Sequence, residues 1–192
     1  RSAVKKGYRV VVADKLTDAG DLIRLEDVKG EYTFYKTDIC DKKRISGIFN
    51  KEMPDRVVHF AAETHVDRSI YDASIFIKTN VEGTLVLLDI CRKFGVKKIV
   101  HLSTDEVYGE IERGKFTEGS PLRPNSPYAA SKAAADLLIR SYIKTFDFPA
   151  VIVRPCNNYG PWQYPEKFIP HSILWVLKGG KIPVYGSGSN VR

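Results

Sequence analysis

Residues 97–110, KKIVHLSTDEVYGE, hold a short apolar run that is followed at once by a cluster of small and polar residues. The run KKIVHL has the length and the Val and Ile content of a buried strand. Ser103, Thr104, Asp105 and Glu106 follow its end. In α/β sheets the ligand lies beyond the carboxyl ends of the strands, so this stretch predicts both a strand and the edge of a binding site.

Four further apolar runs predict a parallel sheet around this strand. They lie at residues 8–13, 32–37, 56–60 and 149–154, and helical stretches separate the strands near residues 41–52, 71–94 and 127–147. The strands are apolar continuously rather than at alternate positions, which is typical of strands buried on both faces. This order predicts an α/β fold with a Rossmann-like, doubly wound parallel sheet.

Both ends of the chain are expected to be truncated. The chain opens on RSAVKKG, which has the pattern of the tail of a helix. A dinucleotide-binding fold should instead begin with a strand and a Gly-rich turn. The other end, GSGSNVR, stops without a capping element.

The composition favours an ordinary globular domain, with 43% hydrophobic and 28% charged residues among 192. No apolar run approaches the roughly 20 residues of a membrane span, and the first residues lack the pattern of a signal peptide, so a cytoplasmic protein is expected. The net charge is +7, but the basic residues are scattered along the chain. We therefore expect neither nucleic acid nor a membrane as a partner.

The cysteines and histidines show no spacing typical of metal ligands, so no metal is expected. The three cysteines are far apart in sequence and form no CxxC pair, and the simplest interpretation is buried thiols.

Tyr128 and Lys132, in YAASK, form a candidate catalytic pair, because residues four apart share one face of a helix. The lysine charge favours the phenolate, which can take a proton from a substrate. Pro127 suits the first turn of such a helix. The same spacing recurs at Tyr32 and Lys36, but in a predicted strand, where the two residues would lie roughly 13 Å apart.

Asp105 and Glu106 place two carboxylates next to each other at the end of a strand. In an arbitrary protein such a pair would be interpreted as a solvated acidic turn. Following a Rossmann strand and preceding the YxxxK pair, the two groups are better interpreted as an acid and a base. Elimination of water needs that division of labour.

The string STDEVYGE, followed by YxxxK, resembles the nucleotide-sugar dehydratases of the extended short-chain dehydrogenase/reductase family, above all the dTDP-glucose 4,6-dehydratases. UDP-galactose 4-epimerases share the tyrosine and the lysine but are less similar around Asp105 and Glu106. Asp18 departs from the pattern, because a tyrosine is common there. The resemblance extends over essentially the whole chain through DKLTDAG (14–20), HFAAETHVDRSI (59–70), KTNVEGT (78–84), RPCNNYGP (154–161) and PEKFIP (165–170).

The resemblance implies the residues of the site. The catalytic set would be Thr104, Asp105, Glu106, Tyr128 and Lys132. NAD would contact Asp14, Lys15, Leu16, Thr17, Asp38, Ile39, Ala61, Ala62, Thr64, Thr79, Ser103, Tyr128, Lys132 and Asn158. The nucleotide sugar would contact Thr104, Asn157, Lys167, Phe168, Pro183, Tyr185 and Arg192.

The resemblance also implies an activity and a domain division. Residues 1–165 would form an NAD-binding Rossmann domain without its first strand and Gly-rich loop, and residues 166–192 would begin a nucleotide-sugar-binding region. The enzyme would be an NAD-dependent hydro-lyase that converts dTDP-glucose to dTDP-4-keto-6-deoxyglucose. UDP-glucose 4,6-dehydratase, 4-epimerase or decarboxylase activity, and a non-catalytic dinucleotide-binding remnant, remain alternatives.

A homodimer is implied as well, formed through the helical stretches 71–94 and 127–147. We expect an apolar surface stripe on these helices that includes Leu85, Leu88 and Leu138.

Overall fold

The computed structural model describes residues 1–182, 184 and 186–188. Arg1–Pro155 forms one compact unit, and Cys156–Arg192 forms a second. The division expected at residue 165 concerns binding regions rather than contacts, and it stays a prediction.

Parallel strands form the centre of the first unit. β1 (Val10–Asp14) pairs with β2 (Tyr32–Lys36). β4 (Lys98–Leu102) lies between β3 (Arg56–His59) and β5 (Ala150–Val153), and both of these pairings are also parallel. The five predicted strands and the α/β class are confirmed, although the strands form two sheets, β1-β2 and β3-β4-β5, where the sequence predicted one.

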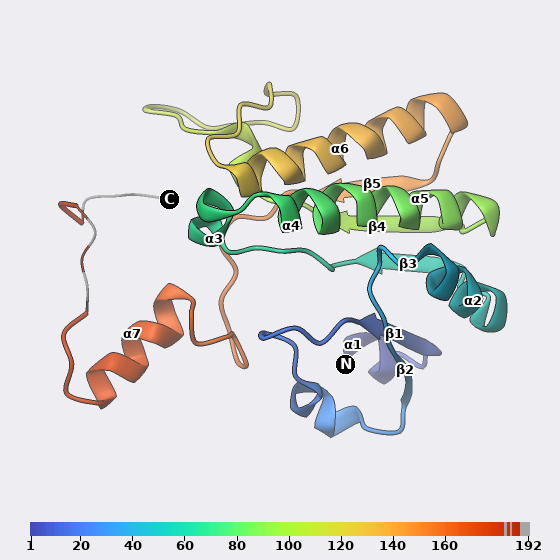
Figure 1. Ribbon diagram of the computed structural model, residues 1–192, viewed down its shortest axis with the longest axis horizontal. Coiled ribbons are helices and arrows are strands. Elements are labelled where there is room, and N and C mark those ends of the chain that lie inside the picture. The colour runs from blue at the N-terminus through green and yellow to red at the C-terminus, as the bar shows by residue number, and fades with distance from the viewer. Residues whose placement is uncertain (183, 185, 189–192) are drawn as a thin grey trace. The chain divides into compact units, whose positions relative to one another are not determined.

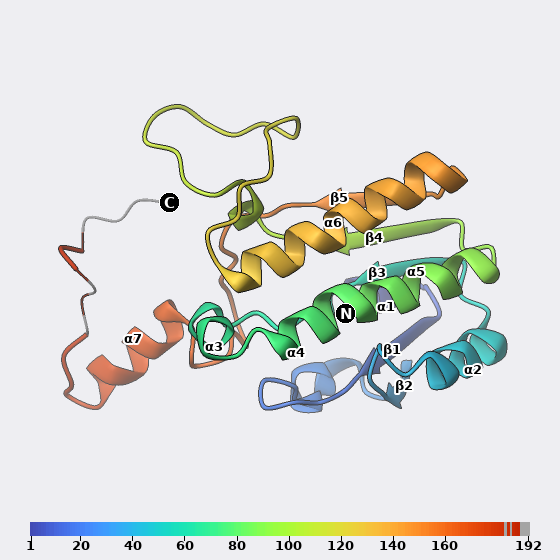
Figure 2. The ribbon, with the colours of Figure 1, turned by 45° about the horizontal axis from the view of Figure 1, so that its top comes forward.

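The helices follow the predicted order. Figures 1 and 2 show α2, α5 and α6 side by side over one face of the strands. The helix predicted as a single stretch at 71–94 is interrupted at Asp72, because the Asp72 side chain accepts hydrogen bonds from the backbone N–H and the hydroxyl of Ser74. The helical elements are α1 (Ser2–Lys5), η1 (Leu22–Val28), α2 (Lys42–Glu52), α3 (Val66–Tyr71), α4 (Ser74–Phe76), the π-helix η2 (Ile77–Glu82), α5 (Gly83–Lys93), η3 (Asp105–Tyr108), α6 (Pro127–Phe146) and, in the second unit, α7 (Phe168–Leu177).

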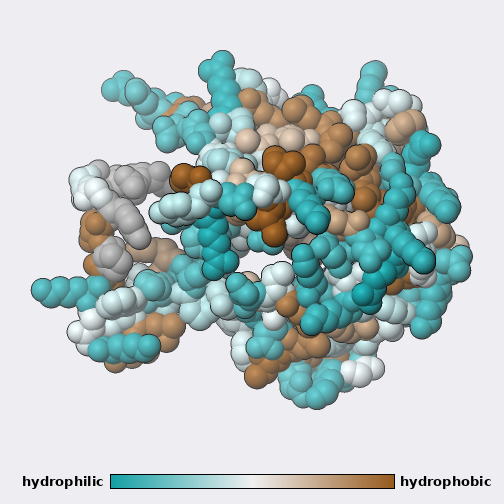
Figure 3. Space-filling view, in the orientation of Figure 1, coloured by the Kyte–Doolittle hydropathy of each residue, from teal (hydrophilic) through white to brown (hydrophobic). Residues whose placement is uncertain are grey.

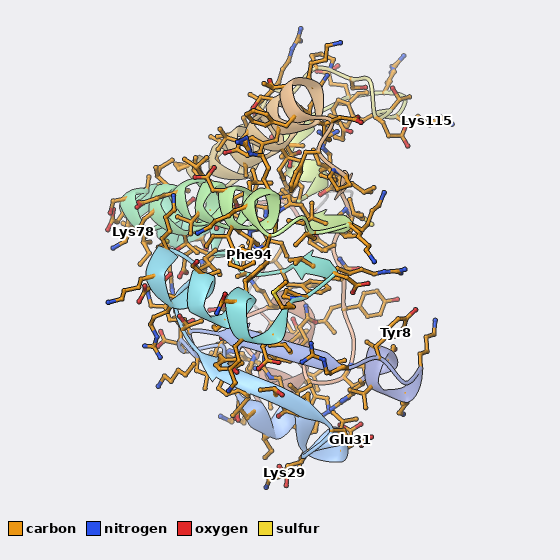
Figure 4. All side chains as sticks on the ribbon, turned by 90° about the vertical axis from the view of Figure 1, so that its right-hand side faces the viewer. Tyr8, Lys29, Glu31, Lys78, Phe94 and Lys115 are labelled. Atoms are coloured by element: carbon orange, nitrogen blue, oxygen red, sulfur yellow. The ribbon has the colours of Figure 1, made fainter. Side chains whose placement is uncertain are left out.

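The main core lies between these helices and the three-stranded sheet. Phe49 of α2 packs against Phe94, with ring centroids 5.8 Å apart, and Figure 4 shows Phe94 between α2 and α5. The buried members of this cluster are Ile45, Phe49, Leu87, Leu88, Ile90, Cys91, Val96, Ile99, Ile139 and Phe148. Burial of these side chains, worth roughly 1.5–3 kcal/mol for each large one, fixes α5 and α6 against β4.

Within the first unit, Arg1–Pro155, no helix covers the second face of the three-stranded sheet. Val58, Phe60, Val151 and Val153 are 37–72% exposed, whereas their neighbours on the opposite face point into the core. The expectation that these strands are buried on both faces is therefore wrong for the described residues, because α2, α5 and α6 all lie on one face.

Two other expectations need correction. Leu88 is fully buried and Leu138 packs against the core, so only Leu85 of the expected stripe is exposed. Figure 3 nevertheless shows apolar side chains gathered on the side of α5 and α6. Among the cysteines, Cys91 is buried but Cys156 is exposed.

Candidate active site

The end of β4 and the turn that follows it form the centre of the site. The backbone N–H of Ser103 donates to Val153 O at 2.8 Å, and that of Asp105 donates to Pro155 O at 3.1 Å. These bonds continue the pairing of β4 with β5 beyond the strand ends. The main chain that leads to the two carboxylates is therefore held at the carboxyl edge of the sheet.

Asp105 and Glu106 open the short helix η3. Thr104 caps this helix, because its hydroxyl accepts a hydrogen bond from Glu106 N at 3.3 Å and also lies 3.3 Å from Asp105 Oδ1. Val107 and Tyr108 are buried and point into a small cluster with Ala133. The two acids are half-buried and precede this anchored pair.

Gly109 ends the turn in a conformation that favours glycine. Its φ is +84°, and a Cβ at this position would lie 2.2 Å from Arg123 O. Since Arg123 N also donates to Val107 O at 2.9 Å, the chain around residue 123 packs directly on the turn. A side chain at residue 109 would force that contact apart.

Tyr128 lies in the first turn of α6, which the sequence starts as expected. Ser126 caps the helix by accepting from Ala129 N at 3.1 Å, and Pro127 follows. The Tyr128 backbone N–H donates to Ser69 Oγ at 3.1 Å, and its ring meets Phe76 edge to face at 6.4 Å. Tyr128 is thus held by α3 and α4 as well as by its own helix.

Lys132 reaches from α6 to the end of β4. Its Nζ donates to Leu102 O at 2.7 Å and lies 3.4 Å from His101 Nε2. Burial lowers the pKa of Lys132 to about 8, and the nearby charge of Asp136 opposes part of that decrease. The structure therefore brings the YxxxK helix to Leu102, the residue directly before Ser103.

A layer of neutral polar groups lies beneath Lys132. The rings of His59 and His101 are 4.9 Å apart, and His59 Nε2 lies 3.0 Å from Thr84 Oγ1. Because the Thr84 hydroxyl donates to Asn80 O, it accepts from His59 Nε2–H. Burial lowers the pKa of His59 to about 3 and that of His101 to about 2, so both rings are uncharged near neutral pH.

Asn80 joins the loop after β3 to α6. Its side chain accepts from Glu63 N at 2.8 Å and donates to Glu63 O at 3.0 Å and to Ser131 Oγ at 2.9 Å. Ser131 Oγ in turn donates to Tyr128 O. We name this set of bonds the Asn80 clamp.

The residues expected around the adenosine end of NAD lie at the ends of β1 and β2. The exposed Asp14 accepts from Leu16 N at 2.7 Å, and Lys15 Nζ lies 2.7 Å from Asp38 Oδ2. Burial opposes ionisation of Asp38, but its hydrogen bonds with Lys15 and Cys40 lower its pKa overall. The structure thus brings these two strand ends together.

Ile39 and Thr17 were also expected to contact NAD, but their side chains are placed differently from those of Asp14 and Asp38. The Ile39 side chain is 9% exposed and packs against Gly83, where a Cβ would lie 2.5 Å from Ile39 Cδ1. Only the backbone of Ile39 remains suited to contact a ligand. Thr17 is exposed, and its carbonyl accepts from Gly20 N at 2.7 Å.

The expected middle of the NAD site lies after β3 and in η2. The Asn80 clamp places the loop that carries Ala61, Ala62 and Thr64 beside the helix that carries Thr79. Ser103 is buried.

The remaining predicted residues belong to the second unit. The Asn158 side chain donates to Cys156 O at 3.0 Å. Lys167 occupies the N-cap position of α7 without a side-chain capping bond, and its Nζ lies 3.6 Å from Glu166 Oε1. Asn157 and Phe168 are exposed. Pro183, Tyr185 and Arg192 lie outside the described residues.

No sequence motif marks the buried and half-buried polar residues behind the site. They come from separate elements and carry no motif, although Asp136 lies one helical turn after Lys132 and could have been noticed on that spacing. These residues are His59, Asn80, His101, Tyr108, Asp136 and Arg154.

In residues 1–182, 184 and 186–188, no group of three or more His, Cys, Asp or Glu side chains is placed to bind a metal ion. No helix in this part of the chain has the length and apolar character needed to span a bilayer.

Comparison with known proteins places this geometry among nucleotide-sugar enzymes. Residues 1–192 match the "NAD dependent epimerase/dehydratase family". A dTDP-glucose 4,6-dehydratase from Actinoplanes sp. is 47% identical over 186 residues, which are 96% of this chain and 58% of that protein.

Solved structures give the same similarity. A dTDP-glucose 4,6-dehydratase from Streptomyces venezuelae with NAD bound has a TM-score of 0.88 and 49% identity, over 95% of this chain and 56% of that one. A UDP-glucose 4-epimerase from Thermus thermophilus in complex with NAD has a TM-score of 0.86 and 34% identity, over 96% and 60%. The chain spans between half and two thirds of the length of these relatives.

Proposed function

The chain belongs to the NAD-dependent epimerase/dehydratase family, and from this premise we propose that the protein containing it dehydrates dTDP-glucose to dTDP-4-keto-6-deoxyglucose. The observation that carries the proposal is the placement of Asp105 and Glu106 in η3, at the strand end to which Lys132 also reaches. An epimerase needs the tyrosine and the lysine but no acid pair. A dehydratase needs both sets.

The residues fit an NAD site. Asp14 ends β1 with an exposed carboxylate, which suits the ribose hydroxyls of NAD and disfavours a 2′-phosphate. We propose that the other cofactor contacts are those expected from the sequence, with Ile39 contributing its backbone. NAD, when bound, supplies the acceptor and later the donor of hydride.

The protein's own groups then divide the proton transfers. Tyr128 removes the proton of the sugar C4 hydroxyl, with the Lys132 ammonium favouring its phenolate. The resulting 4-keto group acidifies the C5 proton, and Glu106 removes it. Asp105 protonates the C6 hydroxyl, which leaves as water, and Glu106 finally returns a proton to C5.

Substrate contacts, assembly and location are also part of the proposal. Thr104, Asn157, Lys167, Phe168, Pro183, Tyr185 and Arg192 contact the nucleotide sugar, with Lys167 and Arg192 suited to the pyrophosphate. The protein acts in the cytoplasm as a homodimer. The exposed Leu85 and Leu137, on neighbouring helices, support an interface there.

The test is to mix the full-length protein with dTDP-glucose and NAD. The alkali-induced absorbance of a 4-keto-6-deoxy sugar is the expected result, and UDP-glucose in a parallel reaction tests the choice of base. Formation of dTDP-galactose would instead identify a 4-epimerase. Absence of any product would leave a non-catalytic dinucleotide-binding protein.

A further inference from the structure

We propose that Asp136, Arg154 and Tyr108 form a buried tether that positions the Asp105–Glu106 turn relative to Lys132. This inference rests on the proposed dehydratase function and assigns positioning roles to three residues that do not themselves react. It follows from a continuous chain of contacts through three elements of the first unit.

The tether begins on the catalytic helix. Asp136 lies in α6 one turn after Lys132 and is fully buried. Arg154 Nε donates to Asp136 Oδ2 at 2.7 Å. A second nitrogen of the same guanidinium, Nη1, donates to the Tyr108 hydroxyl at 2.7 Å. Arg154 therefore bridges the helix that carries Lys132 and the turn that carries the acids.

The backbone around Arg154 holds the other end of the same turn. Arg154 directly follows β5, and its two neighbours, Val153 and Pro155, accept the backbone bonds from Ser103 and Asp105. The acid pair thus lies between two anchor points, a backbone bond at Asp105 and a side-chain bond at Tyr108. Arg154 makes the bond to Tyr108 itself, and its neighbour Pro155 accepts the bond from Asp105.

The Tyr108 ring is itself held in place. It is 7% exposed and stacks on Phe116 at a centroid distance of 5.2 Å and an interplanar angle of 18°. Because the ring is packed on this side and Gly109 closes the turn behind it, the hydroxyl bond to Arg154 sets where η3 ends.

Stability alone does not account for these residue types. Burial raises the pKa of Asp136 even though hydrogen bonds with Arg154 and Ser103 oppose the increase. Replacing a buried ion pair with apolar residues is often neutral or stabilising. A fork that binds two partners in fixed directions explains the choice of arginine better.

The tether has a selective consequence for the reaction. Oxidation at C4 uses Tyr128 and Lys132, which are held by α6 and its own contacts. Elimination uses Asp105 and Glu106, whose turn depends on the Tyr108 bond. Loss of that bond should therefore slow elimination more than oxidation.

The test is Tyr108→Phe in the full-length enzyme, which removes the hydroxyl and keeps the ring. In single-turnover mixing with dTDP-glucose, reduced nicotinamide should form at a rate within about twofold of wild type. Exchange of the C5 proton with deuterated solvent and formation of the 4-keto-6-deoxy product should each fall by about tenfold, the scale of one lost hydrogen bond to a charged group.

Tyr142→Phe is the matched control. Tyr142 lies on α6, the helix that carries Lys132 and Asp136, and its hydroxyl donates to Asp89 Oδ1 at 2.5 Å in a tyrosine–carboxylate contact away from the acids. This variant should leave both steps unchanged. Arg154→Lys, which keeps the charge but not the two-way fork, should reproduce the slow elimination.

The outcomes separate the inference from the function. A wild-type enzyme that carries out both steps while Tyr108→Phe matches it at every step would overturn the tether alone, as would equal slowing of oxidation and elimination. A wild-type protein that forms neither reduced cofactor nor keto sugar would overturn the proposed function, and the tether with it.

Discussion

The spacing Tyr-x-x-x-Lys occurs twice in the chain, at Tyr32–Lys36 in β2 and at Tyr128–Lys132 in α6. In the helix four residues advance about 6 Å and return to the same face. In the strand four residues advance about 13 Å. The same spacing can therefore bring the tyrosine and the lysine together only where the chain is helical.

The surroundings of the two lysines differ in the same sense. Lys36 is exposed, whereas Lys132 is 2% exposed and donates to the carbonyl that ends β4. Tyr128 is likewise buried against Phe76, whereas Tyr32 is only half-buried. Tyr128 and Lys132 are therefore buried, and Lys132 has a fixed hydrogen-bond partner. Tyr32 and Lys36 are ordinary residues of a strand.

The largest expected effect comes from removing one hydroxyl from each copy. Tyr128→Phe in the full-length enzyme should slow formation of reduced nicotinamide by about 10²- to 10⁴-fold, because the proposed base for the C4 hydroxyl is lost. Tyr32→Phe should stay within about twofold of wild type. Stopped-flow absorbance after mixing with dTDP-glucose measures both. Equal losses in the two variants would show that the helical setting is not what matters.

A second substitution separates C4 oxidation, assigned to Tyr128 and Lys132, from the elimination that follows it. Glu106→Gln keeps size and hydrogen bonding but removes the proposed C5 base. Reduced nicotinamide should still form and then accumulate, while dehydration falls by about 10²- to 10⁴-fold. Mass spectrometry of C5 deuterium incorporation is the readout. Exchange at the wild-type rate would mean that another group is the base. Asp105→Asn is the companion variant, which should slow loss of water but spare that exchange.

The burial of Lys132 predicts a pH dependence. Its pKa is lowered to about 8, so the ammonium is lost as pH rises through that value and the oxidation rate should decline there. Asp136→Asn removes a charge that raises the Lys132 pKa, so the decline should begin at lower pH. Tyr108→Phe keeps that charge and should leave the decline in place. Rates of reduced-nicotinamide formation measured between pH 6 and 10, a range spanning roughly two units on either side of 8, test this. Coincident profiles for wild type and Asp136→Asn would contradict it.

The smallest expected effect is on the pH dependence of stability and comes from the histidines beneath Lys132. Among the described residues, no such histidine layer lies beneath Lys36 of β2. The folded-state pKa of His59 is about 3, below the value of 6.5 for an unperturbed histidine. The unfolded chain therefore binds a proton that the folded chain does not, and stability falls as pH drops below about 6.5, by up to about 1.4 kcal/mol per pH unit.

His59→Gln removes this titration while leaving a donor for Thr84. Its free energy of unfolding in urea should fall less between pH 6.5 and pH 5, a window set by the histidine titration at about 6.5, and the pH dependence of the two proteins should agree above pH 7, where neither state is charged. Parallel pH dependence throughout would show that His59 is protonated in the folded state.

The fold was predictable from sequence where local pattern decides it. Runs such as KKIVHL and PAVIVR became strands within a residue or two of their expected ends, and Ser126-Pro127 set the start of α6. The break at Asp72 was missed because a local side-chain turn overrode the helical period. The exposed face of the three-stranded sheet was not predicted. Continuous apolar character indicates that a strand can be buried on both faces, but it does not identify an element that covers each face.

The positions of site residues were predictable where the residues are close together in the sequence. Thr104, Asp105 and Glu106 share one turn, and Tyr128 and Lys132 share one helix, so spacing alone places them. The layer beneath them was not predictable. Tyr108, Asp136 and Arg154 are brought together by pairing of β4 with β5 and packing of α6, and no local pattern contains that information.

The Asn80 clamp has a consequence for how this region opens. The Glu63 amide is bonded to a side chain on η2, and the same side chain is bonded to Ser131 on α6. Displacement of the Asn80 side chain would break both sets of bonds at once, so we expect the loop after β3 and the first turns of α6 to open together. Solvent should therefore reach the Glu63 amide and the first turns of α6 in the same rare opening event, which makes that amide a hydrogen-exchange reporter for the helix that carries Tyr128 and Lys132.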